Sequence, residues 1–253
     1  MTVERIPLSR LVFACCLAAL ALLTACSSET EKPFKYDGDM VLAISWQAGF
    51  CETRPRLPEC RSQTIDRFDA TNFALHGLWP QPRRQSYCGV EDEQIELDRA
   101  RRWSRLKGLG LSEELQVDLL EVMPGARSFL HRHEWVKHGT CYSDDPETYF
   151  DDSLWLMEEI NQSALRDLFA KSIGRQLSGR KIRQVVDSIF GPGAGDRVRV
   201  ACKRDGRRMV ITELTIGLSG KIAANTKLSD LILAAPRTRP GCPSGVVDAV
   251  GLQ

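Results

Sequence analysis

Cysteine placement is the strongest constraint on what this chain can fold into. The 253 residues include nine cysteines, of which three lie within the first 26 residues. The other six are spread along the rest of the chain: Cys51, Cys60, Cys88, Cys141, Cys202 and Cys242. An even set of cysteines in an exported chain predicts three disulfides, although six cysteines allow 15 pairings. Buried free thiols are the alternative for a chain kept in a reducing compartment.

The N-terminal segment predicts export. Two arginines precede the apolar run 11–23, which is too short and wrongly flanked for a stable membrane span. We therefore interpret residues 1–25 as a signal peptide. The junction Leu-Thr-Ala-Cys26 resembles a bacterial lipoprotein cleavage box, in which the cysteine becomes the lipidated first residue of the mature protein. Ordinary signal cleavage nearby is the alternative.

The rest of the chain divides into a tether and one domain. Residues 26–35 are polar and short, which suits a flexible tether. Residues 36–253 are enough for one domain with a sizeable core, and neither an internal repeat nor a Pro/Gly linker divides them. This organisation fits a monomeric enzyme or binding protein that has no obligate protein partner. Its only contact with a membrane would be through its N-terminal lipid.

Net charge gives little guidance to the partner. The full chain carries +1, and removing the signal segment takes away two arginines and one glutamate, so no net charge remains. A polyanionic partner must therefore be bound by a local basic surface. The basic runs 99–107 and 203–208 are candidates, although such runs more often form solvated surface.

Titratable side chains gather in the stretch 129–141, which holds three of the four histidines. Its pattern predicts a helix from about Ser128 to His138 that stops at Gly139. We expect four of its side chains to share or border one face: His133, Glu134, Lys137 and His138. An acid, imidazoles and an ammonium that converge can transfer protons and neutralise a phosphate. Each residue taken singly would fit an ordinary solvated helix face, but the combination favours a functional site.

Zinc is the competing interpretation of this stretch. A metalloprotease helix needs His-Glu-x-x-His, with the two imidazoles four residues apart on one face. His133 and His138 are five residues apart, which turns them about 140° from each other around a helix. The spacing therefore disfavours a metal site and a metal-dependent hydrolase, and we expect no cofactor.

Apolar periodicity outlines the remaining elements. Residues 40–46 read as a buried strand, and residues 73–75 read as a strand that leads into His76. Helical spacing covers a segment that follows the cap Ser112 and ends near Met123, and the segments 149–160, 164–173 and 181–190, the last with Ser178 as its expected cap. Strands 197–201 and 209–218 flank the hairpin signal Asp205-Gly206. Helices and an antiparallel sheet in blocks indicate the α+β class, in a single disulfide-stapled domain.

Two segments together carry a family resemblance. His76-Gly-Leu-Trp-Pro80 and His133-Glu-Trp-Val-Lys-His-Gly-Thr-Cys141 resemble the two active-site segments of the ribonuclease T2 family. A lone histidine after a strand is usually structural, so the second segment gives His76 its significance. The resemblance implies one α+β domain and a secreted, periplasmic or vacuolar endoribonuclease. Such an enzyme cleaves single-stranded RNA without metal, through a 2′,3′-cyclic phosphate and then to a 3′-phosphate.

The resemblance also implies roles for individual residues. His138 is similar to the general base that takes the 2′-hydroxyl proton, and His76 to the general acid that protonates the leaving 5′-oxygen. Glu134 and Lys137 would support the phosphorane, and His133 would contact the phosphate. This chemistry suits the residue types, because RNA carries its own nucleophile and the enzyme needs two imidazoles of opposite protonation state.

The base site and the cysteine pairing are implied in the same way. Trp79 is similar to a base-stacking platform, with a core tryptophan as the alternative, and Tyr87 would assist it. The implied bridges are Cys51–Cys60, Cys88–Cys141 and Cys202–Cys242. Three positions depart from the family pattern, namely Gln81, Leu130 and His131, which leaves base preference open. A non-catalytic envelope lipoprotein that binds RNA or another partner is the competing function.

Overall fold

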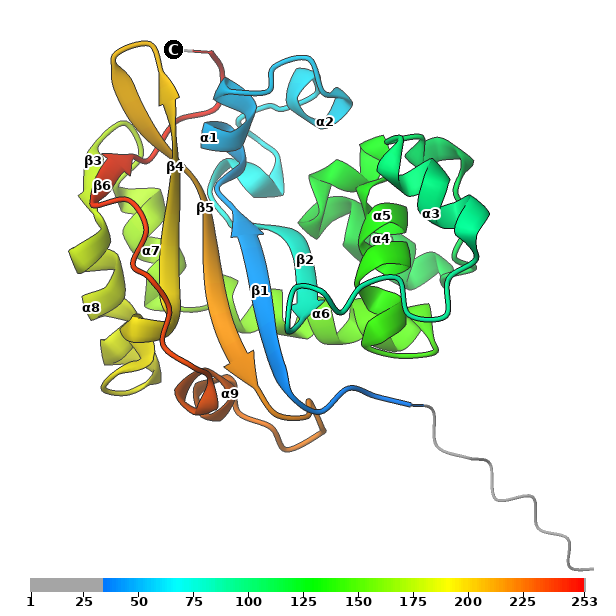
Figure 1. Ribbon diagram of the computed structural model, residues 1–253. Helices are drawn as coiled ribbons and strands as arrows, with labels where there is room; N and C mark the ends of the chain where they lie inside the picture. The colour runs from blue at the N-terminus through cyan, green and yellow to red at the C-terminus, as the bar shows by residue number, and fades with distance from the viewer. Residues whose placement is uncertain (1–33, 253) are drawn as a thin grey trace, which may run out of the picture. The chain divides into compact units, whose positions relative to one another are not determined.

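A six-stranded sheet organises the computed structural model, which describes residues 34–252 (Figure 1). The strand order is β2-β1-β5-β6-β3. The remaining strand, β4, also pairs with β5. Neighbouring strands are antiparallel except β5 and β6, which form one parallel pair at Val210 and Val246. The strands are β1 (Asp39–Ser45), β2 (Ala74–Pro80), β3 (Gln176–Ser178), β4 (Val198–Asp205), β5 (Arg208–Ser219) and β6 (Ser244–Val246).

Helices lie in the connections between these strands, as expected for the α+β class. The α-helices are α1 (Gln47–Glu52), α2 (Pro58–Arg61), α3 (Asp92–Arg99), α4 (Glu113–Val122), α5 (Leu130–Lys137), α6 (Pro146–Asn161), α7 (Ala164–Lys171), α8 (Gly179–Phe190) and α9 (Leu228–Ala234). Short 3₁₀ helices are η2 (Phe68–Ala70), η3 (Trp103–Arg105), η4 (Pro124–Ser128), η5 (Gly139–Cys141) and η6 (Ala194–Arg197).

The two faces of the central strands differ in polarity. Along β5, Leu214, Ile216 and Leu218 are fully buried, whereas the residues between them are partly exposed. Alternation with a period of two puts these sets on opposite faces. The apolar face belongs to the main core, to which α6 and α7 contribute, and Figure 1 shows these helices behind the sheet. The opposite face is therefore the one left for chemistry, and it includes Glu213.

Local sequence signals account for most element boundaries. The predicted caps are confirmed, because the hydroxyls of Ser112 and Ser178 accept hydrogen bonds from the first turns of α4 and α8. The hairpin is confirmed as well: Asp205 pairs with Arg208, and Gly206 has φ of 51°, a left-handed conformation that glycine adopts readily. The predicted helices and the strands at 40–46, 197–201 and 209–218 are present within a few residues of the expected bounds.

The helix expected from Ser128 starts later. Phe129 has φ of 64°, which breaks the helical path and separates η4 from α5. Leu130 is therefore the first residue of α5, and His138 follows its last residue as the C-cap. His76 also differs from expectation, because β2 continues past it to Pro80 instead of ending before it.

Three disulfides join the described residues in the implied pairing: Cys51–Cys60, Cys88–Cys141 and Cys202–Cys242. The second one ties the loop after β2 to the turn after α5. A backbone hydrogen bond of 3.0 Å from Tyr87 N to Lys137 O reinforces the same junction. The two active-site segments are thus held together covalently.

The predicted signal peptide, Cys26 and most of the tether lie outside the described residues. Among residues 34–252, no helix is both long and apolar enough to cross a bilayer.

Candidate active site

A bulge in β2 sets the direction of His76. Ala43 of β1 pairs with Gly77, but the next residue, Ile44, pairs with Leu75, so His76 is the extra residue. A bulge redirects side chains relative to regular alternation. His76 and Trp79, which are three residues apart and would point to opposite faces of a regular strand, therefore approach each other, with ring centroids 5.2 Å apart.

Two carboxylates contact the His76 imidazole. Nδ1 lies 2.6 Å from Oε2 of Glu213, and Nε2 lies 3.7 Å from Oε1 of Glu134. The side chain of Glu134 is 1% exposed and that of His76 is 33% exposed. Solvent or substrate can therefore reach the imidazole, while the carboxylate behind it stays buried.

Gly77 is required by this arrangement. A Cβ at this position would lie 2.0 Å from Oε2 of Glu134 and 2.6 Å from Nε1 of Trp79, well inside van der Waals contact. The indole N–H of Trp79 donates a hydrogen bond of 2.7 Å to the same Oε2. Three residues of the His76–Pro80 segment thus have linked functions. His76 supplies a titratable ring, Gly77 leaves space for the Glu134 carboxylate, and Trp79 donates the hydrogen bond that holds this carboxylate.

The end of α5 supplies the second imidazole. The His138 ring lies 5.5 Å from the Trp79 ring and 6.4 Å from the His133 ring. Its Nδ1 is buried without a hydrogen-bond partner among residues 34–252. Lys137 lines the cavity described below and forms no ion pair within the described part of the chain. The Lys137 ammonium, unpaired among the described residues, is therefore available to a ligand in the cavity.

The two histidines have opposite electrostatic settings. Burial by itself lowers the pKa of His76, but the hydrogen bond to Glu213 and the charges of Glu134 and Glu213 outweigh burial and raise the pKa above its ordinary value. Burial lowers the pKa of His138 to about 3, and the nearby Lys137 charge adds to this effect. Burial also raises the pKa of Glu134. At neutral pH, His138 is therefore neutral, whereas His76 favours its proton more than a free imidazole does.

His133 lies with Nε2 3.8 Å from Oε1 of Glu134 and also belongs to a second hydrogen-bonded group. Its Nδ1 lies 2.6 Å from Oδ1 of Asp98, and its ring stacks on Trp103 with centroids 4.6 Å apart. The hydroxyl of Tyr87 donates to the other oxygen of Asp98 at 2.8 Å. Burial is the main cause that raises the pKa of Tyr87 to about 12, and the Asp98 carboxylate adds to this effect. Asp98, on α3, therefore orients both side chains that were expected to contact substrate.

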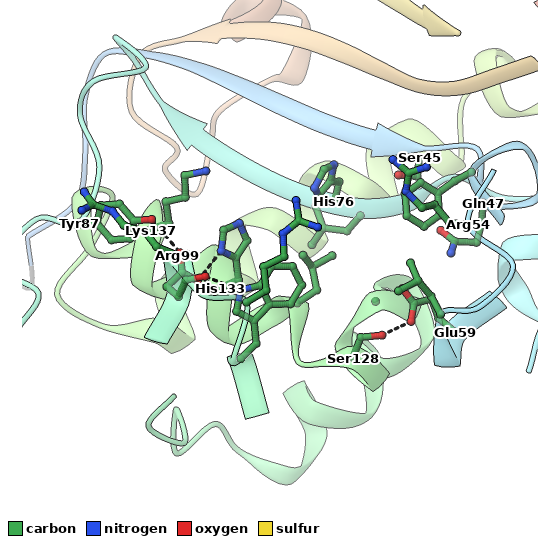
Figure 2. A pocket seen from close by; sticks show the side chains of 18 residues that line it. Ser45, Gln47, Arg54, Glu59, His76, Tyr87, Arg99, Ser128, His133 and Lys137 are labelled. Atoms are coloured by element: carbon green, nitrogen blue, oxygen red, sulfur yellow. Dashed lines mark hydrogen bonds and ion pairs between the residues drawn. The ribbon is translucent and has the colours of Figure 1, made fainter. Parts of the chain in front are cut away.

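These groups surround a cavity of about 730 Å³ (Figure 2). Figure 2 shows Lys137 and Tyr87 toward one end and Arg54 and Glu59 toward the other, with His76 between them. Four of the predicted site residues line it: His76, Tyr87, His133 and Lys137. Glu134, His138 and Trp79 are not among the lining residues but contact those that are.

Sequence reasoning missed three residues of this site. They are Glu213, Asp98 and Trp103. Glu213 is the only acidic residue of β5 and lies on its less buried face, a signal that could have marked it. No comparable signal marks the other two, because Asp98 is one of several acids on α3 and Trp103 lies in a basic run.

Within residues 34–252, no three His, Cys, Asp or Glu side chains are placed to hold a metal ion together.

Known proteins resemble this chain in sequence and in fold. Residues 37–230 match the family model described as Ribonuclease T2 family. Ribonuclease I of Escherichia coli is 33% identical over 210 residues, which are 75% of this chain and 77% of that protein. Extracellular ribonuclease LE of Solanum lycopersicum is 26% identical over 176 residues, 68% of this chain and 73% of that protein. The crystal structure of RNase NT in complex with 5′-AMP superimposes with a TM-score of 0.54 at 16% identity, covering 85% of this chain and 100% of that one. This structural match supports the fold alone.

Proposed function

Because this chain belongs to the ribonuclease T2 family and is an endoribonuclease of that type, we propose that His76 and His138 are its general acid and general base. One observation carries the assignment. Two imidazoles with oppositely shifted pKa values lie beside the ring of Trp79, whose indole N–H holds the buried Glu134, and Lys137 lines the adjoining cavity. Paired groups whose environments push their pKa values apart are the usual mark of an acid and a base.

The first step is transphosphorylation within the RNA. Neutral His138 takes the proton of the ribose 2′-hydroxyl, and the oxygen attacks the adjacent phosphorus. The bond from phosphorus to the 5′-oxygen breaks, and His76 gives its proton to that oxygen. The products are a 2′,3′-cyclic phosphate and a free 5′-hydroxyl. Lys137 stabilises the negative charge that builds up on the phosphorane, and His133 contacts the phosphate.

The second step hydrolyses the cyclic phosphate with the roles of the two histidines exchanged. His76 removes a proton from water, and His138 protonates the departing 2′-oxygen, which leaves a 3′-phosphate. Both pKa shifts oppose this exchange, since they favour a protonated His76 and a neutral His138. Hydrolysis is therefore the slower step, and cyclic phosphate accumulates before it is consumed.

Base binding is the part of the site with the least specific chemistry. The proposed stacking platform, Trp79, is partly exposed, and its indole N–H is committed to Glu134, so its ring can stack a base without reading its edge. Tyr87 lines the cavity, with its hydroxyl bound to Asp98 and the Arg99 guanidinium 5.5 Å from the centre of its ring. The 5′-AMP in the complex of RNase NT supports a nucleotide-sized ligand for this fold.

Binding of RNA without cleavage is the competing function. It would keep the fold and the basic groups, but it gives no reason for a buried glutamate held by Trp79 beside two histidines of opposite protonation preference. Burying a carboxylate is costly, so a surface that only binds has no use for one here.

Metal independence can be tested directly. Cleavage of single-stranded RNA by the purified protein should be unchanged in excess EDTA, because the proposed steps use only imidazoles, an ammonium and the substrate's own hydroxyl. Initial rates measured before and after dialysis against chelator would check this. Loss of activity that zinc or magnesium restores would contradict the proposal, and a well-folded protein that binds RNA without cutting it would favour the competing function.

Export and lipidation complete the proposed function. We propose that mature protein begins at Cys26, carries lipid on that residue, and faces the periplasm or the cell surface. Full-length protein expressed in a bacterial host should partition with membranes, and a Cys26→Ala variant should not. Mass spectrometry of the mature N-terminus checks this, because an unmodified N-terminus at another residue would replace the anchor with ordinary export.

A further inference from the structure

Glu213 reaches His76 across an intervening strand. Glu213 lies on β5 and His76 on β2, and β1 separates the two strands. Ser45 of β1 pairs with Glu213 on one side and with Ala74 on the other. Glu213 therefore lies in the same row of the sheet as Ala74, which is two residues before His76. The β1 residues on this face nearest to the contact are Ala43 and Ser45, whose small side chains leave room for it.

The bond requires features from both strands. Glu213 pairs through Ser45 with Ala74, two residues before His76, and the alternation of β5 puts Glu213 on the face away from the apolar core. The resulting distance of 2.6 Å between Nδ1 and Oε2 is that of a charge-assisted hydrogen bond. This contact depends on the fold. The two residues are 137 positions apart in sequence, and β1 lies between their strands.

We propose that Glu213 is a positioning residue that holds His76 as the general acid by binding Nδ1 and directing Nε2 to the leaving oxygen. This inference rests on the proposed acid role of His76. Glu213 itself touches neither substrate nor reacting atoms, because it acts at the nitrogen that does not transfer the proton. Neither the active-site motifs nor the cluster on α5 includes this residue.

The charges around His76 support a distinct role for Glu213. Glu134, Lys137 and His138 face the ring from α5 and its C-cap, and Glu213 faces it from β5. Glu134 lies on the Nε2 side at 3.7 Å, where the substrate must also approach. Glu213 alone among these groups binds Nδ1 at hydrogen-bond distance, so its contact can persist while the proton leaves Nε2.

Glu213 also specifies the tautomer after the step. When Nε2 has given up its proton, the neutral ring keeps the proton on Nδ1 as a donor to the carboxylate. Nε2 is then unprotonated and directed at the site, as the base of the hydrolysis step must be. One contact therefore serves the ring in both of its proposed roles.

The test separates the acid from the rest of the site by changing the leaving group. Glu213→Gln keeps the size and an acceptor but removes the charge. It should lower kcat/KM on a dinucleoside phosphate about tenfold or more, a part of the 10²–10⁴-fold typical of a whole acid or base. It should also move the basic limb of the pH profile to lower pH, because His76 loses a group that favours its protonated form. On a nucleoside 3′-aryl phosphate, whose phenolate leaves without protonation, it should stay within about twofold of wild type.

Further variants keep the test decisive. Glu213→Ala should lose more activity on the dinucleoside phosphate than Glu213→Gln, and added formate should restore part of it. Asp39→Asn, which removes a carboxylate at the far end of β1, is the matched control and should leave the basic limb in place. Thermal unfolding and circular dichroism confirm that each variant is folded.

Two outcomes would overturn the inference. Equal loss on both substrates would show that Glu213 supports the sheet or the general base. An unchanged pH profile with full activity would show that Glu213 has no role. Failure of the proposed function looks different, because wild-type protein would then not cleave the dinucleoside phosphate at all.

Discussion

Replacing His138 with alanine should lower kcat/KM on single-stranded RNA by about 10²–10⁴-fold, the usual contribution of a general base. The ring nitrogen Nδ1 is uncommitted within the described residues, and burial with the nearby Lys137 keeps the imidazole neutral. The neighbouring groups that remain do not replace it, since Glu134 is buried behind His76 and Lys137 is a cation. His76→Ala should have an effect of the same size through loss of the acid. Steady-state kinetics on one defined oligonucleotide measures both.

The controls come from the same helix. His131 and His133 are the histidines of α5, and His131 lines a different hollow with Leu119 and Ala126. His131→Ala should therefore keep activity within about threefold of wild type, a small change beside that expected of a base. Unfolding of each variant should stay cooperative, because the core and the three disulfides do not depend on these rings. A folded His138→Ala protein that cuts RNA within tenfold of wild type would end the assignment of the base.

Where the sequence carried a local signal, it predicted the fold well. Ser112 and Ser178 marked helix starts because a cap acts within one turn, and Asp205-Gly206 marked a hairpin because the turn itself needs those residues. The break at Phe129 escaped prediction, since a non-glycine residue in the left-handed region is held there by its surroundings. The parallel contact of β6 with β5 also has no local sequence pattern. It lies at Val210 of β5, beyond Glu213, where the pairing of β5 with β1 ends.

The site divides in the same way. His133, Glu134, Lys137 and His138 were found together because helical spacing is readable from sequence. Glu213 is 137 residues from His76, and Asp98 is 35 residues from His133. Only the sheet order and the packing of α3 on α5 bring these carboxylates to their imidazoles. Two sequence motifs can therefore point to the proposed reacting groups, but the carboxylates that bind their rings come from elsewhere in the chain.

A DNA oligonucleotide that contains a single ribonucleotide should be cut only at the phosphate on the 3′ side of that residue, and the same sequence made entirely of DNA should not be cut at all. The proposed reaction uses the 2′-hydroxyl of the substrate as its nucleophile, so its removal deletes a reactant instead of weakening a contact. The expected loss therefore exceeds that of any single substitution in the protein. Gel analysis of end-labelled substrates measures both the position and the rate of cutting.

The ends of the fragments give the same test a second readout. The 5′ fragment should carry a 2′,3′-cyclic phosphate at early times and a 3′-phosphate later, since hydrolysis runs against both histidine pKa shifts. Binding of the all-DNA strand is the internal control, because the proposed contacts of Lys137 and His133 are to phosphate, which both polymers share. All-DNA that is bound but uncut would separate recognition from chemistry. Cutting of all-DNA at a comparable rate would require a nucleophile from water, and His138 would then have to activate water in the first step, which the proposed mechanism does not allow.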